Sequence, residues 1–188
     1  MSGDIIKIRG TRGLSVYDLF GIDDCHGINF MPDTYTEMDF PSSLTFDRIF
    51  MARRAPRDLE NQLEMERITE RYGYKTVFLE DYSIRDQLGI GAQAKHVIAV
   101  HGAAMSFLLM SKRIDSLIEI LPPNVYHDVF PICLSPRVVR YEQIIPNFDE
   151  RVAHSGWEAI SYFKNRRFSV SVKLVECLLS EIHHCTSS

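Results

Sequence analysis

The sequence predicts one α/β domain built on an open parallel sheet, and two observations support this fold class. Between residues 46 and 120, short β-type runs alternate with segments whose apolar residues recur at helical spacing. Several of these runs, such as residues 97–100, are apolar throughout, which is typical of strands buried on both faces of a parallel sheet. The chain has 188 residues, 45% of them hydrophobic, which suits one substantial core.

The elements are expected in a regular order along the chain. Strands are predicted at residues 46–52, 75–79, 97–100 and 116–120, and helices at residues 57–72, 83–94 and 103–111. Gly73 ends the first helix and Ser83 is the expected N-cap of the second. The buried face of the first helix is predicted to carry Leu59, Leu63, Ile68 and Tyr72. Four strands alternating with three helices describe a Rossmann-like core.

The two flanking regions are less regular. Residues 1–45 are rich in Gly, Asp and Pro and are expected to form irregular cover or an edge strand. The core is assigned to residues 46–125, and residues 126–188 are assigned to a C-terminal loop and closing helix. Within that last region we expect a loop after Pro123, a strand at 137–144 and a helix at 169–184.

Composition and charge argue against several functional classes. The net charge of −4, without a basic run interleaved with aromatic residues, argues against nucleic-acid binding. The four cysteines form no CxxC pair, so neither a zinc site nor a disulfide framework is indicated, and a reducing compartment is expected. The sequence shows no signal-peptide core and no apolar span of about 18 residues, so we expect a cytoplasmic protein without a transmembrane segment.

The turn after the third predicted strand is the strongest candidate for a ligand site. His101, Gly102, Ala103 and Ala104 lead from an apolar strand straight into a helical pattern. Ligands of open α/β sheets collect at the carboxyl ends of the strands, where a helix N-terminus offers N–H groups and partial positive charge to an anion such as a diphosphate. Small side chains at this turn would let a ligand approach the backbone.

Two other predicted strand ends carry polar groups at the same edge. Arg53 and Arg54 follow the first strand, and Glu119 lies near the end of the fourth. Guanidinium groups match phosphate oxygens, and a carboxylate can accept from ribose hydroxyls. The alternatives are surface salt bridges for the two arginines, a partly buried polar position for His101, and a solvent-facing edge position for Glu119.

A set of short motifs resembles the C-terminal half of glycosyltransferase family 61. The motifs are IFMARR at residues 49–54, ENQLE at 60–64, YGY at 72–74, LEDYS at 79–83, VHGAA at 100–104 and LIEILP at 117–122. Their order and spacing agree with the family over residues 46–125. Two positions depart from the pattern, because Gln62 stands where the family has an acid and Ala104 where it has glycine.

The resemblance implies a GT-B fold and an inverting, metal-independent glycosyltransferase that needs no cofactor. Its donor would be a nucleotide-sugar, usually a UDP-sugar, and its acceptor a glycan or other hydroxyl, as in polysaccharide biosynthesis. It implies that Arg53 and Arg54 face the diphosphate, that His101, Gly102 and Ala103 lie beside it, and that Glu119 takes the ribose.

Two questions stay open at the level of sequence. His101 is the candidate catalytic base, with Asp23, Asp24 and His26 as alternatives. Residues 1–45 are too few for the second domain of a GT-B enzyme, so another domain or chain would complete the acceptor site. The alternative function is a non-catalytic Rossmann-like module that binds a nucleotide or a protein.

Overall fold

The structure is a computed structural model that describes residues 9–10, 44–123, 129–146 and 166–184. Within these residues the strands form one six-stranded sheet in the order β1-β6-β5-β4-β2-β3. Strand β1 (Arg9–Gly10) pairs antiparallel with β6 at one edge. The other five strands are parallel, namely β2 (Arg48–Met51), β3 (Lys75–Val77), β4 (His96–Val100), β5 (Ser116–Ile120) and β6 (Tyr141–Ile144). The predicted Rossmann-like α/β fold is confirmed.

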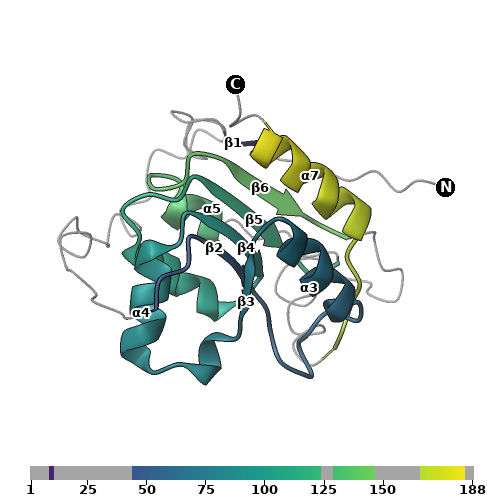
Figure 1. Ribbon diagram of the computed structural model, residues 1–188, viewed down its shortest axis with the longest axis horizontal. Helices are drawn as coiled ribbons and strands as arrows, with labels where there is room; N and C mark the ends of the chain where they lie inside the picture. The colour runs from purple at the N-terminus through teal and green to yellow at the C-terminus, as the bar shows by residue number, and fades with distance from the viewer. Residues whose placement is uncertain (1–8, 11–43, 124–128, 147–165, 185–188) are drawn as a thin grey trace.

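Helices cover both faces of this sheet. Figure 1 shows α3 (Gln62–Arg71) and α7 (Val172–His184) on one side of the sheet and α4 (Ile84–Gln93) on the other. The α4 face also carries the 3₁₀ helix η2 (Ala103–Met110) and α5 (Val129–Leu134). A short 3₁₀ helix, η1 (Leu79–Asp81), links β3 to α4.

Two apolar cores form because successive strand residues point to opposite faces. On β4, Ile98 and Val100 pack in the core under α3 and α7, whereas Val97 and Ala99 pack in the core under α4, η2 and α5. This alternation explains why the central strands are apolar at almost every position. One exception is Glu119 on β5, which is completely buried.

The structure corrects the predicted first helix. Helix α3 begins at Gln62 rather than at residue 57, so Leu59 lies in the preceding turn, where it is still fully buried. Leu63 is 69% exposed, so its predicted place on the buried face was wrong. The buried face of α3 is instead formed by Met65, Ile68 and Thr69 together with Gln62. Gly73 ends the helix with a φ of 79°, as predicted.

Two further differences concern helices near the site. The predicted helix at 103–111 is a 3₁₀ helix over Ala103–Met110, which is long for this tighter helix type. Helix α5 lies where a loop was predicted, and its Pro131 falls in the first turn, where proline is tolerated.

Strand β6 extends the sheet past residue 125. The Ser83 N-cap of α4 is confirmed, because its hydroxyl accepts a bond from Asp86 N.

The strand order places a topological switch point between β2 and β4. From β2 the chain first passes through α3 to β3 on one side, and it then returns through α4 to β4 on the other side. The segments that follow β2 and β4 therefore diverge to opposite faces of the sheet. Open α/β sheets bind ligands in the crevice outside the carboxyl ends of the strands at such a point.

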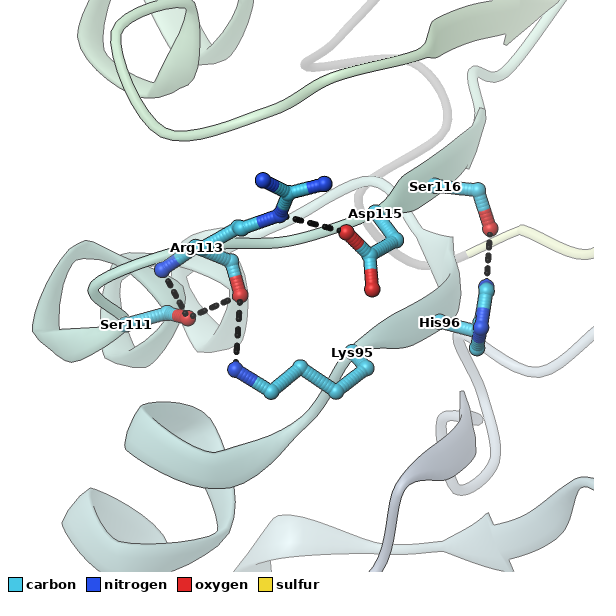
Figure 2. Close-up of polar contacts among 6 residues, drawn as sticks. All are labelled: Lys95, His96, Ser111, Arg113, Asp115 and Ser116. Carbon is cyan, nitrogen blue, oxygen red and sulfur yellow. Dashed lines mark hydrogen bonds and ion pairs between the residues drawn. The ribbon is translucent and has the colours of Figure 1, made fainter.

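Polar residues at the opposite, amino edge of the sheet bind one another (Figure 2). Arg113 Nε donates to Asp115 Oδ1 at 2.7 Å, and Lys95 Nζ donates to the Arg113 carbonyl oxygen at 3.4 Å. His96 Nδ1 lies 2.9 Å from Ser116 Oγ across β4 and β5. These contacts tie the loop before β5 to the start of β4, which gives this edge a structural role.

The C-terminal segment is fastened to the loop that follows β2. Asn61 Nδ2 donates to the Val170 carbonyl oxygen at 2.8 Å, and Asn61 Oδ1 accepts from Val170 N at 3.2 Å. Glu60 N donates to the Phe168 carbonyl oxygen at 2.9 Å. The Asn61 amide thus pairs with both backbone groups of Val170, as a strand neighbour would.

No helix among the described ranges is long and apolar enough to cross a bilayer.

Removing the Asn61 amide should destabilise this attachment. We expect Asn61→Ala to lower the free energy of unfolding by about 1–3 kcal/mol, because a part-buried backbone N–H and C=O lose their partner. Urea unfolding followed by circular dichroism measures the effect. Arg67→Ala, at an exposed position of α3, is the control and should change stability by less than about 0.5 kcal/mol. Equal losses in both variants would contradict the assigned role of Asn61.

Candidate functional site

The candidate site lies where the segments after β2 and β4 leave the sheet. Arg53 follows β2, and His101 and Gly102 follow β4. The two strands are neighbours in parallel register, with Met51 opposite Ala99, so their ends reach the same edge at the switch point. The structure therefore brings together three of the predicted site residues from segments nearly 50 positions apart.

Arg53 is held against the turn that starts η2. Its Nη1 donates to the His101 carbonyl oxygen at 2.9 Å, which uses one of the five N–H donors of the guanidinium. Gly102 is needed for this approach, because a Cβ there would overlap Nη1 and lie 2.8 Å from Cζ of Arg53. With φ 157° and ψ 174°, Gly102 also has a backbone conformation that is essentially restricted to glycine.

The electrostatic surroundings of Arg53 favour a bound anion. Burial lowers the pKa of this guanidinium, the positive charge of Arg57 lowers it further, and the negative charge of Glu80 acts in the opposite direction. Arg53 is half-buried and near the positive charge of Arg57, so an anion bound beside it would offset both positive charges. Arg57 was not singled out from the sequence, although it is the third arginine within five positions.

Arg54 lies apart from Arg53 and has partners of its own. Its guanidinium binds the Asp81 carboxylate through Nη2 and, at 3.3 Å, through Nε, and it stacks on the Phe78 ring with Cζ 4.3 Å from the centroid. The side chain is exposed. Arg54 therefore forms the surface salt bridge that was the alternative expected from the sequence. Its contacts lie at η1 rather than at the turn at Gly102.

Ala103 is the first residue of η2, next to Gly102. The first N–H groups of a helix have no acceptor within the helix, and they point away from its start. Met105 N already donates to the Gly102 carbonyl oxygen at 2.9 Å. The start of η2 and the Arg53 guanidinium together present N–H donors at the switch point.

Behind this turn, His101 and Glu119 form a buried pair. His101 Nδ1 lies 2.6 Å from Glu119 Oε1, and the His101 ring contacts Phe130 of α5 edge-on, with centroids 5.6 Å apart. The other carboxylate oxygen, Oε2, accepts from Tyr141 OH at 2.7 Å and from Gln143 Nε2 at 2.8 Å. The Glu119 side chain is fully buried and that of His101 is 12% exposed.

These contacts contradict the solvent-facing alternative for Glu119. Its carboxylate is fully buried and bonds to His101, Tyr141 and Gln143. Its role toward a ribose stays a prediction. Tyr141 and Gln143 were missed from the sequence. The consecutive polar groups at residues 141–143 give a signal for them only once β6 is known to lie beside β5.

The remaining candidates are placed as follows. Asp23, Asp24 and His26, the alternative bases, lie outside the described residues. Gln62, where the family pattern has an acid, turns its amide back on its own segment, accepting from Leu59 N and donating to Glu66 at 2.9 Å. Within the part of the chain that the structure describes, no group of three or more His, Cys, Asp or Glu residues is arranged to hold a metal ion.

A largely parallel sheet covered by helices, with an arginine and a helix start at its switch point, defines an α/β protein of the class that binds ligands at the carboxyl edge of the strands. The family model of glycosyltransferase 61 matches residues 23–118, more than half of the chain. The chain therefore belongs to the glycosyltransferase 61 family, and by that membership it is a transferase enzyme that uses a sugar donor and an acceptor.

The matched span contains most of the candidate site. It includes Arg53, Arg54, His101, Gly102 and Ala103, and it ends one residue before Glu119. A search of curated proteins finds no match to this chain.

Proposed function

We propose that the chain is the donor-binding part of an inverting, metal-independent glycosyltransferase of the GT-B type. It transfers a sugar from a nucleotide-sugar, of the UDP class, to a hydroxyl of a glycan acceptor. The observation that carries this proposal is the meeting of Arg53, His101 and Gly102 at the switch point of the sheet. The acceptor contacts belong to another domain or chain.

The diphosphate of the donor binds between Arg53 and the start of η2 in this proposal. The guanidinium offers N–H donors beyond the one used at the His101 carbonyl, and the first N–H groups of η2 point to the same place. As the bond between the anomeric carbon and the diphosphate oxygen breaks, the electron pair stays on that oxygen. Arg53 and the η2 N–H groups stabilise the resulting charge, with support from the positive charge of Arg57.

The acceptor hydroxyl attacks the opposite side of the anomeric carbon and loses its proton to a base. His101 is the proposed base, because it lies at the turn that borders the diphosphate position and Glu119 orients its ring. An ionised Glu119 has no proton to donate at Oε1, so the proton of the neutral imidazole resides on Nδ1 and the lone pair on Nε2.

Binding of UDP tests the donor site, and the two adjacent arginines provide a matched pair of variants. We expect micromolar binding by calorimetry with EDTA present. Arg53→Ala should weaken binding by about 10–100-fold, the value of one charged hydrogen-bonded contact, because this side chain lies at the Gly102 turn. Arg54→Ala should change binding by less than about threefold, because its guanidinium is engaged by Asp81 and Phe78.

Three results would contradict the proposal or one of its parts. Absence of heat with UDP, GDP and CDP would refute a nucleotide-sugar site in this chain. Equal losses in Arg53→Ala and Arg54→Ala would show that the diphosphate does not bind at the switch point. A strict requirement for a divalent cation, seen as binding abolished by EDTA and restored by Mg²⁺ or Mn²⁺, would overturn the metal-independent part.

A further inference from the structure

We infer that Tyr141 and Gln143 are positioning residues that act through Glu119 and hold the His101 ring with its proton on Nδ1. The two residues belong to β6 and make no described contact with the His101 side chain. The catalytic consequence rests on the proposed function, in which His101 is the base. Which ring nitrogen of His101 carries the proton can be measured on the protein alone, without donor or acceptor.

The sheet register places these donors at Glu119. Gln143 stands directly opposite Glu119 in the parallel pairing of β5 and β6, and Tyr141 stands opposite Leu117, two residues earlier on the same face. Side chains that are opposite or diagonal on one face of a strand pair lie within contact distance. Both donors therefore approach Glu119 from β6, whereas His101 approaches it from β4.

Burial makes these bonds necessary for an ionised Glu119. A carboxylate removed from water is strongly disfavoured unless hydrogen-bond donors replace the lost hydration. Glu119 is completely buried and has three described donors, at 2.6, 2.7 and 2.8 Å. The two from β6 bind one oxygen, Oε2, and leave Oε1 for His101.

The phenol of Tyr141 is a donor rather than an acceptor in this arrangement. Burial, together with the negative charge of Glu119, raises the pKa of Tyr141 well above its ordinary value. The hydroxyl therefore keeps its proton throughout the neutral range. Because an ionised carboxylate can only accept, the Nδ1 atom of a neutral His101 has to donate to Glu119 Oε1, which leaves the lone pair on Nε2.

The charged and titratable groups around His101 come from four elements. Glu119 on β5 bonds the imidazole at Nδ1, and Arg53 after β2 bonds the His101 carbonyl oxygen. Tyr141 on β6 stays neutral. On α5, Cys133 also stays neutral, because burial raises the pKa of its thiol. Glu119 is thus the described group that bonds the ring directly and sets its tautomer.

The isosteric variant Glu119→Gln tests this inference. The β6 donors should hold the amide oxygen on their side and turn the amide NH₂ toward His101, so Nδ1 becomes an acceptor and the proton moves to Nε2. Two-bond ¹H–¹⁵N correlation spectra, recorded at a pH at which the His101 ring is neutral, distinguish the two tautomers. The His101 signals are assigned by their loss in His101→Gln. We expect the Nδ1–H tautomer in the wild type and the Nε2–H tautomer in Glu119→Gln.

Two outcomes would overturn the inference, and neither requires activity. An Nε2–H tautomer in the wild-type protein would refute the proton placement even if Glu119→Gln failed to fold. An unchanged Nδ1–H tautomer in a folded Glu119→Gln variant would show that the β6 residues do not orient the group at position 119. A role in packing alone would not reverse the tautomer.

Tyr141→Phe extends the test to β6 because it removes only the hydroxyl. In the Glu119→Gln background, Tyr141→Phe should give a mixture of His101 tautomers, because one of the two donors that select the amide orientation is lost. An unmixed Nε2–H signal would exclude a positioning role for Tyr141. The UDP titration is independent of these spectra. If UDP does not bind but the predicted tautomers are observed, the proposed function is refuted and the positioning network of Tyr141, Gln143 and Glu119 is retained.

Discussion

Replacement of Gly91 by alanine should destabilise the protein by about 1–3 kcal/mol, although alanine is the better helix former by about 1 kcal/mol. A Cβ at this position of α4 would overlap the carbonyl oxygen of Phe107 and lie 2.6 Å from the carbonyl carbon. Both atoms belong to the backbone of η2, which cannot move without shifting the whole helix. The lost free energy of unfolding is measurable by urea denaturation with a circular dichroism signal.

An exposed residue of the same helix provides the control. Arg85→Ala should change the free energy of unfolding by no more than about 0.5 kcal/mol, because its side chain is exposed on α4. A neutral or stabilising Gly91→Ala would contradict the close approach of α4 and η2. Since η2 begins at the Gly102 turn, a shift of this helix would also displace the proposed diphosphate contacts.

Gly102→Ala should impair both donor binding and folding. The atoms that its Cβ would meet belong to the Arg53 guanidinium, the free-moving end of a long side chain. The guanidinium can turn away, and it then loses its bond to the His101 carbonyl and its place at the diphosphate. We expect UDP affinity to fall at least about tenfold, as in Arg53→Ala, with a stability loss of about 1–3 kcal/mol from the unfavourable φ.

A double variant separates the clash from the backbone strain. In the Arg53→Ala background, Gly102→Ala should cost at least about 0.5 kcal/mol less than it does in the wild type, because the group that its Cβ would meet is gone. Thermal or urea unfolding of the four proteins gives the coupling. Strictly additive losses would mean that Arg53 does not occupy the space beside Gly102.

The order of strands and helices could be predicted from the sequence because it depends on local patterns. The apolar runs of β2, β4 and β5 and the Ser83 cap of α4 are visible without knowledge of their neighbours. The same applies to the strand ends that carry Arg53 and His101. Parallel strands share an edge, so their meeting follows from fold class alone.

The parts that could not be predicted depend on contacts between distant segments. Arg53 and Arg54 are adjacent and identical in type, yet only the pairing of β2 with β3 brings Asp81 beside Arg54. Glu119 looks available at a strand end until β6 is placed next to β5, with two donors facing it. Side-chain identity indicates what a group can bind, whereas strand order decides what it meets.

The exposure of Leu63 has a similar explanation. A helix starting at residue 57 would align Leu59 with Leu63, but a start at Gln62 removes Leu59 from the helix and rotates Leu63 outward. The start is fixed by the Gln62 side chain, which accepts from Leu59 N, and by the attachment of Asn61 to Val170. The latter contact joins residues 109 positions apart and leaves no local trace in the sequence.

The attachment of Asn61 to Val170 also determines when the loop after β2 is fixed during synthesis of the protein. The loop after Arg53 acquires its bonds to Phe168 and Val170 only after these residues, more than 100 positions later, have left the ribosome. Parallel sheets and other long-range pairings form slowly, and translation adds about 5–20 residues per second. A nascent chain that contains β2 to β6 but not yet residues 168–170 therefore has a sheet whose loop after β2 is not yet fastened.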